Sequence, residues 1–361
     1  MIEPIDPPGL VMATLEPWLV DNVAGFTSTD HITAELLSGG RSNISYVLSN
    51  QGGVRVVLRR PPLGHVMPSA HDMQREFKVL SGLNKTSYPT PRALAVCEDL
   101  QIIGATFMVM SHVAGRVIAD ASDAQHLSST DAKEISANLF DQLAALHAIN
   151  PSDAGLDTLG RPEGYMERQV KRWGEQWQLS QTRQVDEIDV LFKWLNENSA
   201  LLPNNRPSSI VHGDFRIDNV IIDQDVNEIL AVLDWEMATL GDPISDLAIS
   251  LVYWTRPEDK LRANVPVAQH ITDGPGFWTR EQIVENYAAK TGFDVSYLDF
   301  CVALACFKLA VIMESIHKRN LSGQQLGAAS GSSSTMGEAT VALAKLGTQT
   351  ISQGAFTALG S

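Results

Sequence analysis

IVHGDFRIDNVII, residues 210–222, sets five polar side chains between two short apolar runs. The five are His212, Asp214, Arg216, Asp218 and Asn219. The flanking Ile and Val residues predict two short buried strands, with the polar residues in the loop that joins them. A charged group near a buried strand is costly unless another charge or a metal ion compensates it. We therefore expect this loop to be a functional site.

A second acidic residue follows at the end of the next predicted strand, in LDWE at 233–236. A short hairpin between the strands would bring Asp214, Asn219 and Asp234 close together. Two carboxylates and an amide oxygen are hard oxygen ligands that suit Mg²⁺, which takes its remaining oxygens from water or phosphate. The sequence therefore predicts a magnesium site that carries a phosphate group.

The spacing of the polar residues within the loop matches one that is used for phosphoryl transfer. Asp214, Arg216 and Asn219 have the D-x-[KR]-x-x-N spacing of the kinase catalytic loop. Phosphoryl transfer needs an aspartate that orients the attacking hydroxyl and a cation near the transferred group. Asp214 and Arg216 supply both.

HGDFRIDN, followed by LDWE and by GDPISDLA at 241–248, resembles the aminoglycoside phosphotransferase-like family of small-molecule kinases. The resemblance covers roughly residues 30–320. VVLRRPPLGHVMPSAHDMQREFKVL, at 56–80, is most similar to the branch whose members occur fused to, or beside, acyl-CoA dehydrogenases. The resemblance implies an α+β, bilobal protein-kinase-like fold. A small antiparallel-sheet N-terminal lobe with one main helix would span 1–113, and a larger, mainly helical C-terminal lobe 114–361.

The resemblance also implies roles for residues of the C-terminal lobe. Asp214 is expected to be the catalytic base and Arg216 to contact the γ-phosphate of ATP or another nucleoside triphosphate. Asn219 and Asp234 are expected to bind Mg²⁺. His212 and Asp246 are assigned structural roles, with Asp246 bracing the catalytic loop through its backbone amides.

In the N-terminal lobe, SGGRSN at 38–43 resembles the loop that covers the phosphates, with Ser42 and Asn43 as the contact residues. FMVMSHVAG at 107–115 resembles the connection between the lobes. There Met110 would lie behind the adenine, Ser111 would offer a carbonyl and Val113 an amide.

One residue departs from the family pattern. The family usually has a Lys on the third strand, paired with a Glu of the small-lobe helix, whereas VVLRR places Arg59 there with Glu76 as its expected partner. Arginine stays charged and can grip phosphate with two donors, but its planar group is not interchangeable with an ammonium. The alternative is that Arg59 and Glu76 form a surface pair of little consequence.

The pattern of the chain agrees with two lobes. A helix is predicted over 10–23, strands over 31–38, 44–50, 54–60, 92–98 and 106–113, and a helix over 71–83. Long helices follow from 129–149 onward, interrupted by strands at 208–214, 219–225 and 228–236. The Ser- and Gly-rich segment 322–337 is expected to be a mobile loop before a last helix.

Composition narrows the class of protein. The 361 residues are 44% hydrophobic and 19% charged, typical of a globular protein. The formal charge of −15 argues against nucleic-acid binding. No apolar run is long enough to predict a membrane span, and the acidic, proline-containing N-terminus does not resemble a signal peptide. Three cysteines without metal or redox spacing indicate buried thiols. We expect a cytoplasmic protein with no membrane or nucleic-acid partner.

Alternatives to an active kinase remain open. A nucleotide-binding pseudokinase would lack a base or a metal ligand, and only Arg59 hints at it. A glycoside hydrolase using Asp214 and Asp234 would leave Asn219 without a role. The small-molecule acceptor could be an aminoglycoside, favoured by the acidic chain, or a hydroxyacyl-CoA, favoured by the local resemblance. Basic residues at 167–173 and 317–320 could serve the second or could be solvated helix faces. Glu314 and His317 could line an acceptor pocket or belong to a plain amphipathic helix.

Overall fold

The structure is a computed structural model that describes residues 6–37, 43–63, 72–203, 206–225, 227–262, 265–266, 270–323 and 333–360. The chain forms two compact units. The first comprises Met1–Gly115 and Leu230–Glu236, and the second comprises Arg116–Ile229 and Met237–Ser361. A single division after residue 113 would place Leu230–Glu236 with the helices, whereas this segment belongs to the first unit. Asp234 therefore lies in the first unit and Asp214 in the second.

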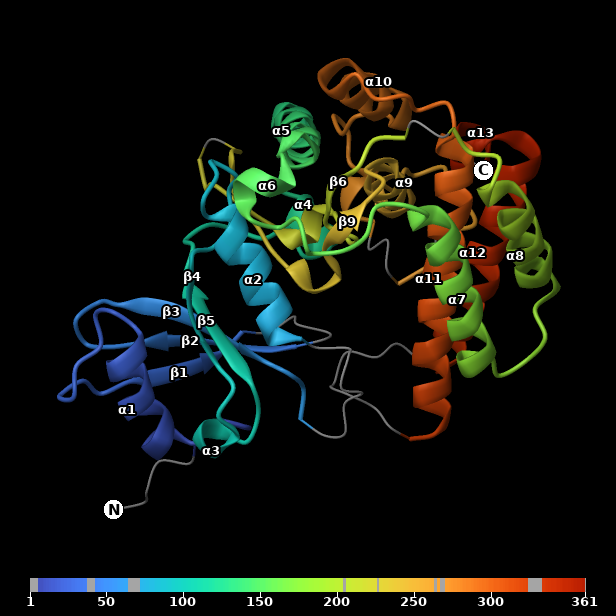
Figure 1. Ribbon diagram of the computed structural model, residues 1–361. Helices are drawn as coiled ribbons and strands as arrows, with labels where there is room; N and C mark the ends of the chain where they lie inside the picture. Colours follow the sequence, from blue (N-terminus) through green and yellow to red (C-terminus); the bar gives the residue numbers. More distant parts are fainter. Residues whose placement is uncertain are drawn as a thin grey trace. The chain divides into compact units, whose positions relative to one another are not determined.

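The first unit is built on an antiparallel sheet of the five predicted strands, in the order β1-β2-β3-β5-β4 (Figure 1). Its elements are α1 (Met12–Asn22), β1 (Thr33–Leu36), β2 (Ile44–Ser49), β3 (Arg55–Arg60), α2 (Met73–Leu83), β4 (Ala93–Cys97), α3 (Leu100–Ile103) and β5 (Phe107–Ser111).

The two faces of this sheet are used differently because side chains alternate along each strand. Leu58 and Val109 are buried in a core that includes Leu15 and Leu19 of α1. Arg59 follows Leu58 on β3 and therefore points to the opposite face. In the pairing of β3 with β5, Arg59 lies opposite Met108. The same face of the sheet therefore carries a charged side chain and apolar side chains.

The second unit is mainly helical, with short strands near its middle. Its helices are α4 (Ala121–Ala124), α5 (Ser129–Ala148), α6 (Pro151–Ala154), α7 (Tyr165–Ser180), α8 (Asp186–Ser199), α9 (Ile244–Tyr253), α10 (Arg280–Thr291), α11 (Leu298–Leu321), α12 (Ser333–Gln353) and α13 (Ala355–Leu359). Its short elements are β6 (Ser209–Val211), η1 (Ile217–Asn219), β7 (Val220–Ile222), β9 (Thr239–Gly241) and η3 (Ile271–Asp273). Most of β8 (Ile229–Val232) and η2 (Trp235–Met237) lies in the segment Leu230–Glu236 of the first unit.

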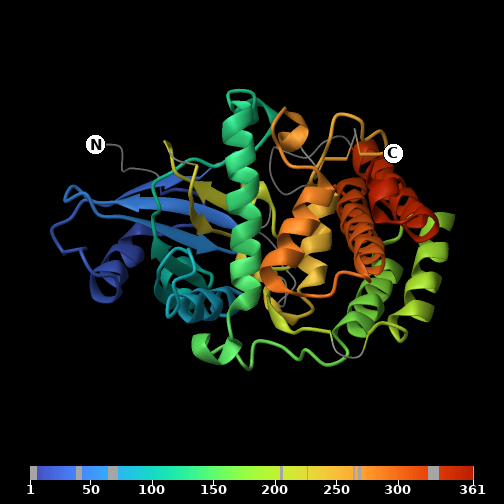
Figure 2. The ribbon, with the colours of Figure 1, turned by 90° about the horizontal axis from the view of Figure 1, so that it is seen from above.

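Helix α11 is the centre of this unit. It packs against α7, α8, α9 and α12, and the group of long helices is seen side by side in Figures 1 and 2. It is long and apolar enough to cross a membrane, but 72% of its most apolar stretch of 18 residues is buried inside the fold. That burial is what a core helix of a globular unit requires.

Two details differ from the sequence-based expectation. Strand β9 was not predicted, because its three residues carry no strand pattern and pair with β6, about thirty positions earlier, Val211 opposite Thr239. Helix α12 begins at Ser333, inside the segment predicted as a loop to residue 337. Most of that segment lies outside the described residues.

Candidate active site

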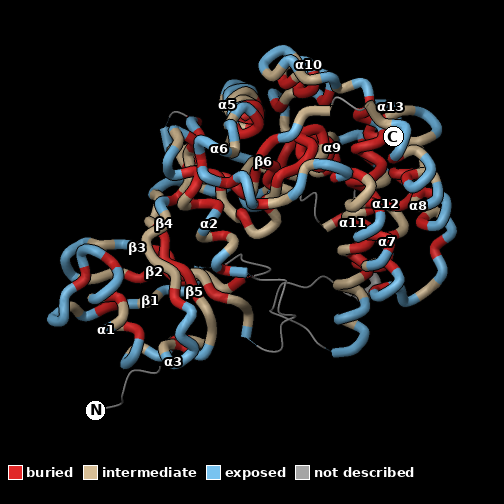
Figure 3. The backbone as a smooth tube through the Cα atoms, viewed as in Figure 1, coloured by how far each residue is buried: buried red, intermediate tan, exposed pale blue. Residues whose placement is uncertain are grey.

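Residues 212–219, the loop predicted to be catalytic and called the catalytic loop below, follow β6 and are held in place by Asp246 near the start of α9. The Asp246 carboxylate accepts the backbone N–H of His212 and, at 2.8 Å, that of Gly213. The Nε2 of His147 lies 3.3 Å from its Oδ2. Figure 3 shows α9 and β6 in a mainly buried part of the second unit. The brace expected of Asp246 is therefore present as backbone hydrogen bonds.

The ionised form of Asp246 is favoured, although the residue is only 1% exposed. Burial works to raise its pKa. The hydrogen bond and charge of His147, the charge of His212 and the Gly213 amide outweigh burial and keep the pKa below 3.8. The loop is thus anchored on an ionised carboxylate.

Asp214, the predicted base, is held at both carboxylate oxygens. Its Oδ1 accepts the Tyr253 hydroxyl at 2.6 Å, and its Oδ2 lies 3.2 Å from Asn219 Nδ2 and 3.5 Å from Arg216 Nε. Burial would raise the pKa of Asp214, but Arg216, Lys308 and the Tyr253 hydroxyl outweigh it and hold the pKa below 3.8. The group is therefore an ionised hydrogen-bond acceptor at neutral pH.

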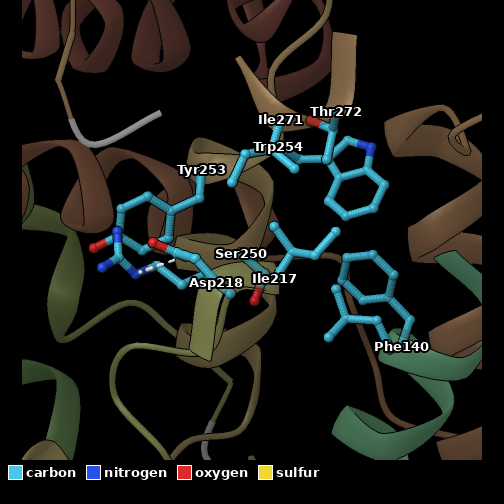
Figure 4. Close-up of a pocket in the computed structure, with 10 residues that line it drawn as sticks. Phe140, Ile217, Asp218, Ser250, Tyr253, Trp254, Ile271 and Thr272 are labelled. Carbon is cyan, nitrogen blue, oxygen red and sulfur yellow. Dashed lines mark ion pairs between the residues drawn. The ribbon is translucent and has the colours of Figure 1, made fainter. Parts of the chain in front are cut away.

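Arg216 is kept in one orientation by two neighbours. Its Nε forms an ion pair with Asp218 Oδ1 at 3.2 Å, and its guanidinium carbon lies 5.0 Å from the centre of the Tyr253 ring. Figure 4 shows the ring beside the guanidinium that the dashed line joins to Asp218, at the edge of a small pocket with apolar walls that include Phe140 and Trp254. Arg216, the cation expected to contact the γ-phosphate, thus lies next to Asp214, the predicted base.

Lys308 of α11 is a further cation at the loop. Its ammonium donates to the Gly213 carbonyl at 2.6 Å and lies 5.7 Å from the centre of the Trp173 ring. Burial is the main influence on its pKa and lowers it, against the opposing charges of Asp214 and Asp246. Lys308 therefore ties the long core helix to the residue before the base.

In the first unit, Arg59 lies in a cluster of three carboxylates. Its Nε is 3.1 Å from Glu76 Oε2 on α2, its guanidinium also bonds to Asp234, and Glu236 lies 3.8 Å away. Asn43 donates to the Glu236 carboxylate at 2.9 Å. The structure therefore brings together Asn43, Arg59, Glu76 and Asp234 of the predicted set and adds Glu236.

The Arg59–Glu76 pair is not the exposed surface pair of the alternative interpretation. The side chains are 13% and 2% exposed. Burial is the largest influence on Glu76 and raises its pKa to about 7, while the Arg59 charge acts in the opposite direction. The Arg59 charge thus favours the ionised form of a carboxylate that burial disfavours.

Three residues were expected to contact the adenine. Met110 lies on β5 opposite Val57, and both are largely buried on the sheet face that also carries Arg59. The Ser111 N–H donates to the Arg92 carbonyl at 2.9 Å, and the Ser111 hydroxyl accepts the Arg92 N–H at 2.9 Å. Val113 is partly exposed in the chain that follows β5. Ser42 lies outside the described residues.

The residues predicted to bind Mg²⁺ offer suitable atoms. Asn219 donates through Nδ2 to the Asp214 carbonyl at 2.9 Å, which leaves its amide oxygen as the atom for a cation. Asp234 has a positive φ of 67° and presents a carboxylate. Among the residues that the structure describes, no three His, Cys, Asp or Glu side chains gather as a metal cluster. A carboxylate oxygen and an amide oxygen are each ligand types that Mg²⁺ prefers.

Comparison with known proteins decides the family. The model of the phosphotransferase enzyme family matches residues 33–280. The chain belongs to this family. The resemblance inferred from HGDFRIDN and LDWE is thereby confirmed.

Relatives of this phosphotransferase chain include acyl-CoA dehydrogenase family member 11 of Rattus norvegicus, 36% identical over 317 residues, which are 86% of the chain and 40% of that protein. Family member 10 of Mus musculus is 31% identical over 337 residues, 92% of the chain and 30% of that protein. The chain thus spans less than half the length of these relatives.

A solved structure shows the same fold. A proposed aminoglycoside phosphotransferase from Ralstonia eutropha is 30% identical in sequence and superposes with a TM-score of 0.76. The match covers 93% of this chain and 97% of the chain in that structure. The predicted α+β, protein-kinase-like fold is confirmed.

Sequence reasoning missed three polar residues of this phosphotransferase site. Tyr253 and Lys308 lie on helices 39 and 94 positions after Asp214, and nothing in their local sequence marks them. Glu236 could have been found, because it stands two positions after Asp234 in LDWE.

Gly213 offers a direct test of the loop geometry. Its φ is +84°, and an added Cβ would lie 2.9 Å from Met237 Cβ and 3.0 Å from the Met237 carbonyl oxygen. We expect Gly213→Ala to lower the free energy of unfolding by about 1–3 kcal/mol and to reduce nucleotide turnover, since Asp214 must shift. Gly292→Ala is the control, because φ is +68° there and nothing lies within 4 Å of the added Cβ. Equal losses in denaturation and turnover for the two variants would contradict the close approach at Gly213.

Proposed function

We propose that this chain transfers the γ-phosphoryl group of ATP, with Mg²⁺, to a hydroxyl group of a small molecule. The observation that carries the proposal is the ionised Asp214, held at both oxygens beside the Arg216 guanidinium in the loop of a phosphotransferase family member. A phosphoryl-transfer site needs this combination of an acceptor for the hydroxyl proton and a nearby cation.

Each residue has a defined task in the proposed reaction. Asp214 accepts a hydrogen bond from the acceptor hydroxyl and aligns its oxygen with the phosphorus. Arg216 neutralises the oxygens of the transferred group, and Arg59, held by Glu76, can contact the nucleotide phosphates with its two donors. Mg²⁺, held by Asn219 and Asp234, would neutralise phosphate charge when bound. The protein thus acts by positioning and electrostatics.

We propose a hydroxyacyl-type anionic acceptor rather than an aminoglycoside. Although the chain is acidic overall, two cations lie at Asp214: Arg216, which also pairs with Asp218, and Lys308, on which the charges of Asp246 and Arg172 also act. The two cations can attract a carboxylate or a phosphate group of an anionic acceptor. The names of the relatives, which refer to acyl-CoA, support the same choice.

A second candidate is a nucleotide-binding module without catalysis. Arg59 bonds directly to Asp234, one of the two proposed magnesium ligands, and this contact competes with a metal ion. Such a module would bind nucleotide without consuming it.

One assay separates these functions. Purified protein is incubated with Mg²⁺ and ATP or GTP, together with hydroxyacyl-CoA thioesters, free hydroxy acids or aminoglycosides, and nucleoside diphosphate release is measured. We expect release with ATP and hydroxyacyl acceptors, at least tenfold above the rate with any aminoglycoside. Nucleotide binding by calorimetry without release from any acceptor would instead support the non-catalytic module. Faster release with aminoglycosides would contradict the proposed acceptor class.

A further inference from the structure

Helix α9 carries a stripe of three polar side chains, and each of them forms hydrogen bonds with the catalytic loop. Asp246, Ser250 and Tyr253 stand at positions i, i+4 and i+7, which lie on one face of a helix. The helix is otherwise almost entirely apolar and buried, so three polar side chains on one face need partners. All three find them in the loop.

The loop residues that bond to this stripe, 212–215, are consecutive in the sequence. Asp246 accepts the N–H groups of residues 212 and 213, Tyr253 bonds to the side chain of residue 214, and Ser250 Oγ donates to the carbonyl of residue 215 at 2.7 Å. Ser250 also reaches the carbonyl of Asp246 at 2.9 Å. One helix face therefore holds four successive residues of the loop, three of them through the backbone and only Asp214 through its side chain.

We propose that Tyr253 is the positioning residue of the reaction, fixing the Asp214 carboxylate and the Arg216 guanidinium relative to each other. This inference rests on the proposed function. The Tyr253 hydroxyl is the partner of Oδ1, while Oδ2 is held by Asn219 and Arg216. With both oxygens bonded, rotation of the carboxylate is prevented. The same ring lies against Arg216, so a single side chain sets both groups.

Tyr253 is suited to this task because it remains a donor. Burial is the main cause that raises its pKa well above 10, and the charge of Asp214 adds to it, with Arg216 acting in the opposite direction. The hydroxyl therefore keeps its proton at neutral pH. Tyr253 is the last residue of α9, so a rigid helix and not a loop sets the position of its ring.

The test is Tyr253→Phe, which removes the hydroxyl and keeps the ring beside Arg216. We expect kcat to fall about 10- to 100-fold, the range for losing a hydrogen bond to a charged group, with the KM and Kd for nucleotide unchanged within twofold. The matched control is Tyr297→Phe. Its hydroxyl donates to the buried Asp242 carboxylate at 3.0 Å, so the same chemical group is lost elsewhere in the second unit. We expect kcat of the control to stay within twofold of the wild type.

A second measurement does not depend on turnover. Crystal structures of the wild type and Tyr253→Phe should show Asp214 in a single side-chain conformation in the former and in more than one in the latter. The inference is overturned if Asp214 is equally ordered in both, or if Tyr253→Phe and Tyr297→Phe lose the same fraction of kcat. If the wild type transfers no phosphoryl group to any acceptor, the proposed function fails, and the comparison of the crystal structures still decides whether Tyr253 fixes Asp214.

Discussion

Asp214→Asn is expected to lower kcat by about 10²–10⁴-fold, the usual contribution of a general base. The amide cannot accept the proton of the acceptor hydroxyl, and it removes the negative charge that aligns Arg216, 3.5 Å away. Nucleotide affinity should stay within threefold, since Arg59 and Glu76 belong to the first unit and keep their contacts. Nucleoside diphosphate release and calorimetric binding measure the two quantities separately.

Asp223→Asn is the control for this change. Its carboxylate accepts the Asp225 N–H at 2.8 Å in the turn after β7, so the same charge is removed from the same unit outside the catalytic loop. We expect its kcat to remain within twofold of the wild type. An Asp214→Asn enzyme that turns over at the wild-type rate would remove the base from the proposed reaction and the kinase assignment with it.

Asp246→Ala is expected to have the largest effect on stability, lowering the free energy of unfolding by about 3–5 kcal/mol. The change leaves the amides of His212 and Gly213 without their acceptor and removes the charge facing His147. Urea denaturation at pH 7 measures the loss. Asp299→Ala is the control, because the exposed Asp299 accepts one amide, that of Ala355, and its loss should cost about 1 kcal/mol.

The pH dependence provides a second measure for Asp246. Because its folded pKa lies below 3.8, its ionised form stabilises the fold at pH values above 3.8, and this contribution is lost as the pH falls through the folded pKa. The difference in unfolding free energy between the wild type and Asp246→Ala should therefore be largest at neutral pH and shrink below pH 3.8. A difference that is constant from pH 7 to pH 3 would show that Asp246 acts only through packing.

The position of the polar loop 212–219 was predictable because its polar residues are close together in the sequence. Asp214, Arg216 and Asn219 fall within six positions, and their spacing alone orders them in a short loop between strands. The Arg59–Glu76 pair was accessible for a related reason. Strand β3 and helix α2 are consecutive elements of one small unit, so the alternation of β3 and the first turn of α2 limit where each side chain can point.

Other parts of the site could not be read from local patterns. Strand β9 has no strand pattern in its sequence, and it forms by backbone pairing with β6. Glu314, weighed as an acceptor-pocket residue, is fully buried and accepts the Thr182 amide and hydroxyl and an Arg183 side chain, so it braces the end of α7. Long-range pairing of this kind depends on packing between helices, which periodicity does not encode.

By itself, the sequence determined the two-part α+β organisation, the family, and the identity of the loop that carries Asp214, since hydrophobic period and short-range spacing act within a few residues. Only the tertiary structure decided how that loop is held: by α9, whose polar stripe meets residues 212–215, and by Lys308 of α11. The physical reason is that a buried polar group must find a partner, and the partner is selected by which helix face packs against it, not by distance along the chain.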